Sequence, residues 1–150
     1  MISVAAATAA LTLTGVSAAG AAAAATAPDG HPVAARALGD ARFSSGATLY
    51  RNGAWTSGSG RTVLRLQQDG NLVLYKDGHA AWQGVGSWPS GASAVMQSDG
   101  NFVVYDGSGR PLWATGTWGH PGAYLAVQDD GNLVVYAASG GPLWATNTGD

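Results

Sequence analysis

Three times this chain repeats one nine-residue stretch, which first reads Gln67-Gln68-Asp69-Gly70-Asn71-Leu72-Val73-Leu74-Tyr75. The stretch returns as Gln97-Ser98-Asp99-Gly100-Asn101-Phe102-Val103-Val104-Tyr105 and as Gln128-Asp129-Asp130-Gly131-Asn132-Leu133-Val134-Val135-Tyr136, at spacings of 30 and 31 residues. Self-similarity at a fixed period of this length is the signature of a repeat architecture. The sequence therefore predicts three copies of one structural unit.

Tryptophan keeps step with the repeat. Trp82, Trp113 and Trp144 lie 31 residues apart, and residues 111–115 and 142–146 have the same sequence. Each of these tryptophans has apolar neighbours in a segment that predicts a third strand of its unit. We therefore expect the three indoles to fill the centre of the fold.

The repeated stretch predicts a β-hairpin. Leu64 and Leu66 alternate with polar or exposed positions, and Leu72 and Leu74 do so after the turn residues. Period two around a glycine-containing turn is typical of two antiparallel strands. A shared buried face for the leucines requires opposed residue numbers to add to an even number, which predicts a three-residue loop over 69–71. In this register residues 65, 95 and 126 would face the tyrosines of the three motifs.

One small sheet cannot bury its apolar face alone, but three sheets around an axis can share a core. The fold class expected is therefore all-β, with three antiparallel sheets. The residues predicted to fill the core are Leu64, Leu66, Leu72, Leu74, Ala94, Met96, Phe102, Val104, Leu125, Val127, Leu133 and Val135.

Composition agrees with a compact all-β domain and excludes several functions. Of 150 residues only 11% are charged, 23 are glycine and none is cysteine. The lack of cysteine excludes disulfides and thiolate zinc sites. The formal net charge of −2 gives no basic surface for nucleic acid. The sequence contains no glutamate, which the calcium loop of an EF-hand requires.

The N-terminal segment differs from the rest. Residues 1–28 carry no charged side chain and are rich in alanine, which predicts a secretory signal peptide with cleavage after Ala19, Ala25 or Ala27. A membrane anchor is the alternative for a run of this length. Residues 29–39 are expected to be a linker or pro-segment, and residues 40–150 the folded domain. The protein is thus expected to be secreted, without stable membrane insertion once the leader is removed.

The other face of each hairpin carries Gln, Asp, Asn, Val and Tyr at alternate positions. This set combines hydrogen-bond acceptors, amides, a hydroxyl and an apolar patch. Vicinal sugar hydroxyls donate to a carboxylate while they accept from an amide, and the C–H groups of a sugar ring need an apolar surface. The pattern therefore indicates a non-catalytic carbohydrate site on each unit.

The motif Gln-x-Asp-x-Asn-x-Val-x-Tyr, three times at this period, resembles the bulb-type mannose-specific lectins (the B-lectin family) over residues 38–150. The resemblance implies a β-prism II fold of three four-stranded sheets with pseudo-threefold symmetry and one α-mannose pocket per sheet. The implied carbohydrate-binding residues are Gln67, Asp69, Asn71, Val73, Tyr75, Gln97, Asp99, Asn101, Val103, Tyr105, Gln128, Asp130, Asn132, Val134 and Tyr136. It implies mannose-containing glycans as partners, no cofactor and no metal, and it leaves a homodimer open.

The chain departs from plant members of that family, which usually have an internal disulfide, so its stability must come from the core. The leader and the alanine-rich, lysine-poor composition are typical of a bacterial protein. An alternative function is a lectin-like bacteriocin that uses the sugar site for targeting, although such proteins tend to have two tandem domains.

Other readings of single residues are weaker. The motif aspartates belong to separate units, too far apart for the paired carboxylates of a glycosidase. His31, His79 and His120 do not repeat in register and predict solvated side chains, not a metal site. Trp88 and Trp118, with Trp55 as a counterpart in the first unit, open the segments that lead into the repeats. The sequence leaves open whether they are exposed for sugar stacking.

Overall fold

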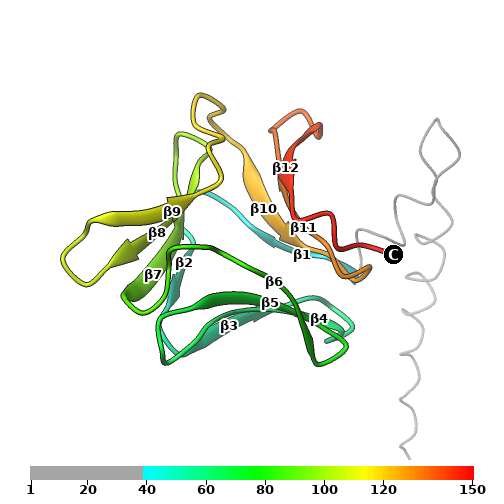
Figure 1. Ribbon diagram of the computed structural model, residues 1–150. Helices are drawn as coiled ribbons and strands as arrows, with labels where there is room; N and C mark the ends of the chain where they lie inside the picture. Colours follow the sequence, from blue (N-terminus) through cyan, green and yellow to red (C-terminus); the bar gives the residue numbers. More distant parts are fainter. Residues whose placement is uncertain (1–38) are drawn as a thin grey trace, which may run out of the picture. The chain divides into compact units, whose positions relative to one another are not determined.

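The computed structural model describes residues 39–150. The predicted signal peptide over 1–28 and almost all of the predicted linker over 29–39 lie outside this range. Within it, twelve β-strands form three four-stranded antiparallel sheets, which Figure 1 shows arranged around a common centre. The strands are β1 (Ala41–Phe43), β2 (Thr48–Tyr50), β3 (Gly53–Thr56), β4 (Thr62–Leu66), β5 (Leu72–Lys76), β6 (His79–Gln83), β7 (Gly91–Met96), β8 (Phe102–Asp106), β9 (Pro111–Ala114), β10 (Tyr124–Val127), β11 (Leu133–Tyr136) and β12 (Pro142–Ala145).

Each repeat supplies three consecutive strands of one sheet, and the fourth strand comes from residues 41–56. The strand orders are β3-β4-β5-β6, β2-β7-β8-β9 and β1-β10-β11-β12. The three short strands β1, β2 and β3 are consecutive in the chain, yet each completes a different sheet (Figure 1). The expected all-β fold of three four-stranded sheets is confirmed.

The hairpin register keeps the predicted parity but differs in its loop. Leu66 pairs with Leu72, and the Gln67 N–H donates to the Asn71 carbonyl at 2.9 Å. The ladder thus extends by one pair, and the three-residue loop covers 68–70 instead of the predicted 69–71. Gly70 in this loop has a φ of 88°, a left-handed conformation that favours glycine.

This shift corrects the expected neighbours of the motif tyrosines. Arg65, Val95 and Ala126 lie opposite the motif valines, not the tyrosines. The residues opposite the tyrosines, in pairs, are Val63 and Tyr75, Ser93 and Tyr105, and Tyr124 and Tyr136.

The core lies where the three sheets face one another. All the residues predicted to fill it have an exposed fraction of 0%. Trp82, Trp113 and Trp144 meet edge to face, with ring centroids 5.2–5.6 Å apart, and pack against this core. Edge-to-face pairs of aromatic rings are favourable because the positive edge of one ring meets the negative face of another. The central placement predicted for these tryptophans is confirmed.

Trp55 does not match Trp88 and Trp118, the residues with which the sequence grouped it. Trp55 stacks on Phe43 at a centroid distance of 4.0 Å and packs against the core. Trp88 and Trp118 have exposed fractions of 62% and 69%. The two loop tryptophans are therefore free on their outer side, whereas Trp55 is structural.

Candidate functional site

The motif side chains of each unit are brought together by the β-hairpin and hold one another in place. In every unit the glutamine Nε2 donates to the tyrosine hydroxyl oxygen eight residues later. The distance is 2.5 Å for Gln67 and Tyr75 and 2.9 Å for Gln128 and Tyr136, and Gln97 bonds Tyr105 in the same way. Because the tyrosine oxygen accepts this bond, its own proton remains available to donate elsewhere.

The aspartate of each motif shapes the loop with one of its oxygens. The Oδ1 atoms of Asp69, Asp99 and Asp130 accept from the backbone N–H two residues later, at 2.9–3.0 Å. This bond is the side-chain turn that aspartate favours. Asp69 and Asp99 are exposed. Each of these two carboxylates therefore presents its second oxygen to an external donor.

The asparagine of each motif has a structural role that the sequence did not indicate. Asn101 Oδ1 accepts from Gly116 N at 2.9 Å, Thr117 N at 3.1 Å and Thr115 Oγ1 at 3.1 Å. Asn71 Oδ1 accepts from Ser87 Oγ at 3.2 Å. The amide oxygen thus fastens the loop that follows the tryptophan strand, and only the Nδ2 group remains for a ligand.

The corresponding contact in the third unit joins Asn132 Oδ1 to Thr146 Oγ1 at 2.9 Å and to Thr148 N at 3.3 Å. A sequence signal for this role exists, because Ser87, Thr117 and Thr148 recur at spacings of 30 and 31 residues. The motif valines are nearly covered. Their exposed fractions are 5% for Val73, 3% for Val103 and 2% for Val134, so each offers only a small apolar surface.

The third motif differs from the others because neighbouring segments cover it. Gln128 has an exposed fraction of 1%, and its Nε2 donates to Asp40 Oδ2 at 3.1 Å. Asp40 Oδ1 also accepts from Asp129 N at 3.1 Å. The residue that precedes β1 thus lies against the glutamine of the third motif.

Aromatic rings complete this cover. Tyr124 stacks on Tyr136 at a centroid distance of 5.5 Å, and the Arg42 guanidinium lies 4.8 Å from the Tyr124 ring centroid. Ala126, opposite Val134, has an exposed fraction of 1%. A small residue at this position therefore does not open the third motif.

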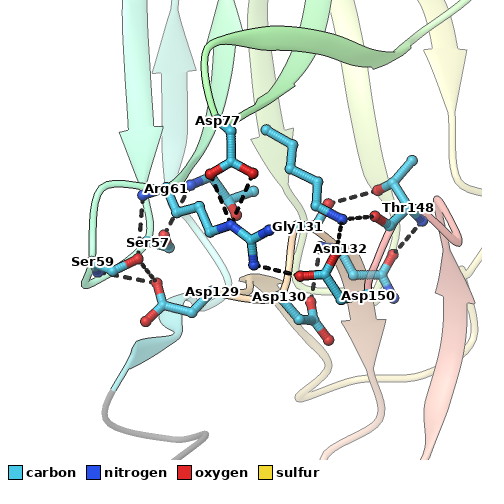
Figure 2. A network of polar contacts seen from close by, with 12 residues as sticks. Ser57, Ser59, Arg61, Asp77, Asp129, Asp130, Gly131, Asn132, Thr148 and Asp150 are labelled. Atoms are coloured by element: carbon cyan, nitrogen blue, oxygen red, sulfur yellow. Dashed lines mark hydrogen bonds and ion pairs between the residues drawn. The ribbon is translucent and has the colours of Figure 1, made fainter.

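A charged network ties the end of the described chain across the third loop, as Figure 2 shows. Arg61 Nε donates to Asp77 Oδ1 at 2.8 Å, and Arg61 Nη1 lies 2.5 Å from Asp150 Oδ2. Lys76 Nζ bonds Asp150 and also donates to Thr148 O at 3.0 Å. Asp150 N donates to Asp130 O at 3.0 Å, which holds this segment beside the third motif.

Hydrogen bonds in this network shift several pKa values. The pKa of Asp77 is lowered chiefly by its bond from Arg61, and that of Asp150 by its bonds from Lys76 and Arg61. The pKa of Arg61 is raised by the same two carboxylates. These groups remain charged at neutral pH and hold the network together.

Asp129 lies at the other end of Figure 2. Burial raises its pKa, but hydrogen bonds from Ser59 and Ser57 outweigh burial, and the pKa is lowered overall. Asp129 Oδ1 accepts from Ser59 N at 3.0 Å and from Ser59 Oγ at 2.6 Å. Asp129, which stands between the third Gln and Asp, therefore links two sheets.

The loop tryptophans adjoin the two open motifs. Trp88 follows Ser87, which bonds Asn71, and Trp118 follows Thr117, which bonds Asn101. The same register places Gly149 after Thr148 in the third unit. His79 and His120 are exposed, and His31 lies outside the described residues. Over residues 39–150 no group of three or more His, Asp or Glu side chains is placed to hold a metal ion.

The described part of the chain also contains no helix long and apolar enough to cross a membrane.

Three four-stranded sheets about one centre, with a polar motif repeated on each sheet, define the class of β-prism proteins.

Comparison with known proteins agrees with this class. No family model matches the chain. The Japanese Marasmius oreades lectin is 37% identical, with a TM-score of 0.67 over 71% of this chain and 90% of that chain. The mannose-specific agglutinin from snowdrop (Galanthus nivalis) bulbs, solved with methyl-α-D-mannoside, is 35% identical, with a TM-score of 0.57 over 75% of this chain and 98% of that chain.

A mannose-specific lectin of Aloe arborescens is 41% identical over 63 residues, which are 40% of this chain and 57% of the lectin. The chain spans about half the length of the curated relatives that it matches. The structural matches, in contrast, extend over nearly the whole of the known lectin domains. The chain belongs to the bulb-type mannose-binding lectin family and has its β-prism II fold. The Aloe arborescens and snowdrop relatives are both mannose-specific lectins by name.

Proposed function

We propose that this protein is a carbohydrate-binding lectin that recognises α-mannose through the motifs of its first and second units. The observation that carries the proposal is the shared geometry of these two motifs. Each presents an exposed aspartate oxygen, an asparagine Nδ2 and a tyrosine hydroxyl whose oxygen already accepts from glutamine. These are complementary donors and acceptors for adjacent hydroxyls of one sugar ring.

The groups are also preorganised, which favours binding. The asparagine and the glutamine are fixed by internal bonds before a ligand arrives, and the strands that hold them are rigid. Binding therefore costs little conformational entropy. In the first unit Asn71 Nδ2 additionally donates to Gln83 Oε1 at 3.0 Å, a bond that a sugar hydroxyl would have to share or replace. In the second unit Ala114 occupies the equivalent position opposite Val103.

The third motif has the same residues but a structural use for them. Asp40 holds Gln128, and the segment around Asp150 lies against Asp130. We therefore assign two working sites to the domain. A shallow site for one sugar ring is expected to bind with a Kd of about 1 mM, and two sites that engage one branched glycan or surface gain roughly 10²–10⁴ in avidity.

The test is retention on a mannose column with elution by methyl-α-D-mannoside. Replacing Asp69, Asp99 and Asp130 by Asn keeps the Oδ1 acceptor that each loop needs and replaces the second acceptor by a donor. We expect the triple variant to fold and to lose retention, because an unpaired sugar hydroxyl costs about 1–3 kcal/mol.

The matched control is Asp106→Asn, a carboxylate at the end of β8 that lies outside the motifs and accepts from the Ser108 and Arg110 N–H groups. This variant should be retained like the wild type. A folded triple variant that still binds the column, or a wild-type protein that does not, would contradict the proposal.

We also propose that the protein acts outside the cell. The support is the charge-free run over residues 1–28, which resembles a signal peptide. Mass spectrometry of protein from the culture medium should find an N-terminus between residues 20 and 40. A secreted form that retains Met1, or its absence from the medium, would contradict this proposal.

A further inference from the structure

Three equivalent residues stand at the outer side of the three motifs. In each sheet the edge strand pairs with the last residue of the strand before the motif glutamine. The pairs are Ala41 with Val127, Ala47 with Met96, and Gly53 with Leu66, and each of the three residues lies just before the first member of its pair. The preceding residues are Asp40, Gly46 and Asn52, which are six positions apart. The size of this residue therefore sets how much room remains beside the motif glutamine.

At the third motif this room is filled. The Asp40 carboxylate accepts from Gln128 Nε2 and from Asp129 N, both at 3.1 Å. At the second motif the equivalent Gly46 has no side chain, and a Cβ built there would meet no atom within 4 Å. At the same position, therefore, a side chain fills the space beside the glutamine in the third unit, and no side chain fills it in the second.

The gap is an open depression with a volume of about 400 Å³. Its lining is formed by Ser45, Gly46, Val95, Met96, Gln97, Ser98 and Asp99. Gln97 and Asp99 belong to the second motif, so the depression is continuous with it. Its volume lies within the range of about 300–1,000 Å³ typical of small-molecule sites.

A second position contributes to the opening. Ser98 lies between the glutamine and the aspartate of its motif, where the first unit has Gln68 and the third has Asp129. Asp129 is drawn away by Ser59. The second unit thus has small residues, Gly46 and Ser98, on both sides of the depression.

We propose that this depression is a subsite for a second sugar residue linked to the mannose in the second motif, and that Gly46 determines its presence. The inference rests on the proposed mannose binding. The hydroxyls of Ser45 and Ser98 and the carboxylate of Asp99 suit the hydroxyls of a sugar, and Val95 supplies an apolar surface for ring C–H groups. The sugar specificity of the second site therefore extends beyond one ring, unlike that of the first.

The hairpin register expected from the sequence would have placed Arg65 beside Tyr75. Arg65 in fact pairs with Val73. The unit that stands out is the second, and the cause is a missing side chain instead of an added one.

The experiment uses the full chain with Asp69→Asn, which leaves the second motif as the open site. The measurement is the ratio of the affinities for an α-linked dimannoside and methyl-α-D-mannoside, from titrations followed by NMR. We expect a ratio of about ten. Adding Gly46→Asn should reduce it to about one, because the new side chain fills the depression. Asparagine suits this backbone, since Asn52 already has a φ of 71° at the equivalent position.

Ser98→Gln fills the depression from its other side with the residue of the first unit, and should also reduce the ratio to about one. Asn52→Gly, beside the silenced first motif, is the matched control and should keep the ratio near ten. A ratio that stays near ten in both filled variants overturns the subsite, as does a ratio near one before any filling. Failure of the single mannoside to bind would instead overturn the proposed function.

Discussion

Gln128 Nε2 donates to Asp40 Oδ2 at 3.1 Å, which joins the residue before the first strand to the last of the three motifs. The contact lies directly beside the pairing of β1 with β10, so a motif side chain helps to join the first strand to the last sheet. The same five residue types therefore serve two purposes in one domain. In the first two units the motif glutamine is partly exposed and the aspartate is exposed, whereas in the third Gln128 is buried and bonds Asp40.

The first prediction separates these purposes. Asp69→Asn with Asp99→Asn should abolish binding of methyl-α-D-mannoside although the third motif is intact, because neighbouring segments cover that motif. Asp130→Asn alone should keep both sites. Titration by NMR measures each case. Millimolar binding that survives the double change and disappears only when Asp130 is also replaced would show that the third site is open.

The second prediction concerns the tryptophan centre. Trp113→Ala should lower the free energy of unfolding by about 3–5 kcal/mol, because it leaves a cavity between Trp82 and Trp144. Trp118→Ala removes the same side chain from an exposed loop and should change the free energy by less than about 0.5 kcal/mol. Urea unfolding followed by circular dichroism compares the two. Equal losses would contradict the central role of Trp113.

The third prediction isolates crowding at the hairpin loop. Gly100 and Gly109 have φ values of 94° and 87°, so alanine at either site incurs the left-handed penalty of about 1–2 kcal/mol. A Cβ at Gly100 would also lie 2.3 Å from the His120 carbonyl oxygen, whereas none lies within 4 Å at Gly109. Gly100→Ala should therefore destabilise the domain by about 1–3 kcal/mol more than Gly109→Ala in urea unfolding. Equal effects would mean that the close approach is relieved without cost.

The fourth prediction distinguishes the two ends of one amide. Asn101→Asp keeps the Oδ1 acceptor for Gly116 and Thr117 and removes the Nδ2 donor. It should leave the folded domain in place while mannose binding at the second site is lost. Asn101→Ala removes both and should also cost about 1–3 kcal/mol of stability, because Thr115, Gly116 and Thr117 lose their common acceptor. Thermal unfolding together with NMR titration tests the pair, and unchanged binding in Asn101→Asp would contradict a role for Nδ2.

The fifth prediction concerns acid. The folded-state pKa values of Asp77 and Asp150 are lowered, so the stabilisation they provide is present above the ordinary aspartate value of 3.8 and is lost as pH falls below it. Asp106, whose pKa is lowered to about 2 by Ser108 and Arg110, extends this loss to lower pH. The urea concentration at the unfolding midpoint should therefore decrease as the pH is lowered from about 4 to about 2, the range over which these aspartates become protonated.

Asp77→Asn should make that fall shallower, and raised salt should reduce the contribution of the exposed ion pairs. If the urea midpoint depended on pH equally steeply in the wild type and the variant, the Arg61 network would not contribute to stability.

Much of the fold follows from the repeat. Period-two leucines around a glycine turn predicted the inner hairpins, and the regular tryptophans predicted the centre. The parity of the hairpin was also predicted correctly. It could not settle the register, because loops over 68–70 and 69–71 place the same leucines inside. The bond from the Gln67 N–H to the Asn71 carbonyl distinguishes the two loops, and the alternation of side chains does not reveal it.

The site was harder to predict because identical motifs differ in their surroundings. Gln67, Gln97 and Gln128 hold the same position in their motifs, yet of the three only Gln128 is shown bonding a carboxylate from a distant segment, that of Asp40. That carboxylate is 88 residues away in the chain. Local patterns identify side chains able to bind sugar, but long-range pairing decides which of them face solvent. The same limit explains why the structural use of the asparagine oxygen was missed.

The consecutive strands β1, β2 and β3 make the three units interdependent. Residues 41–56 are a single short segment that gives one edge strand to every sheet. A cut within this segment would weaken all three sheets at once, whereas a domain of independent modules would lose only one. A unit excised with its own motif would lack its fourth strand, and a fourth copy inserted into the chain would find no strand to complete it. The number of sheets therefore depends on residues 41–56, which supply three edge strands, as well as on the number of repeats.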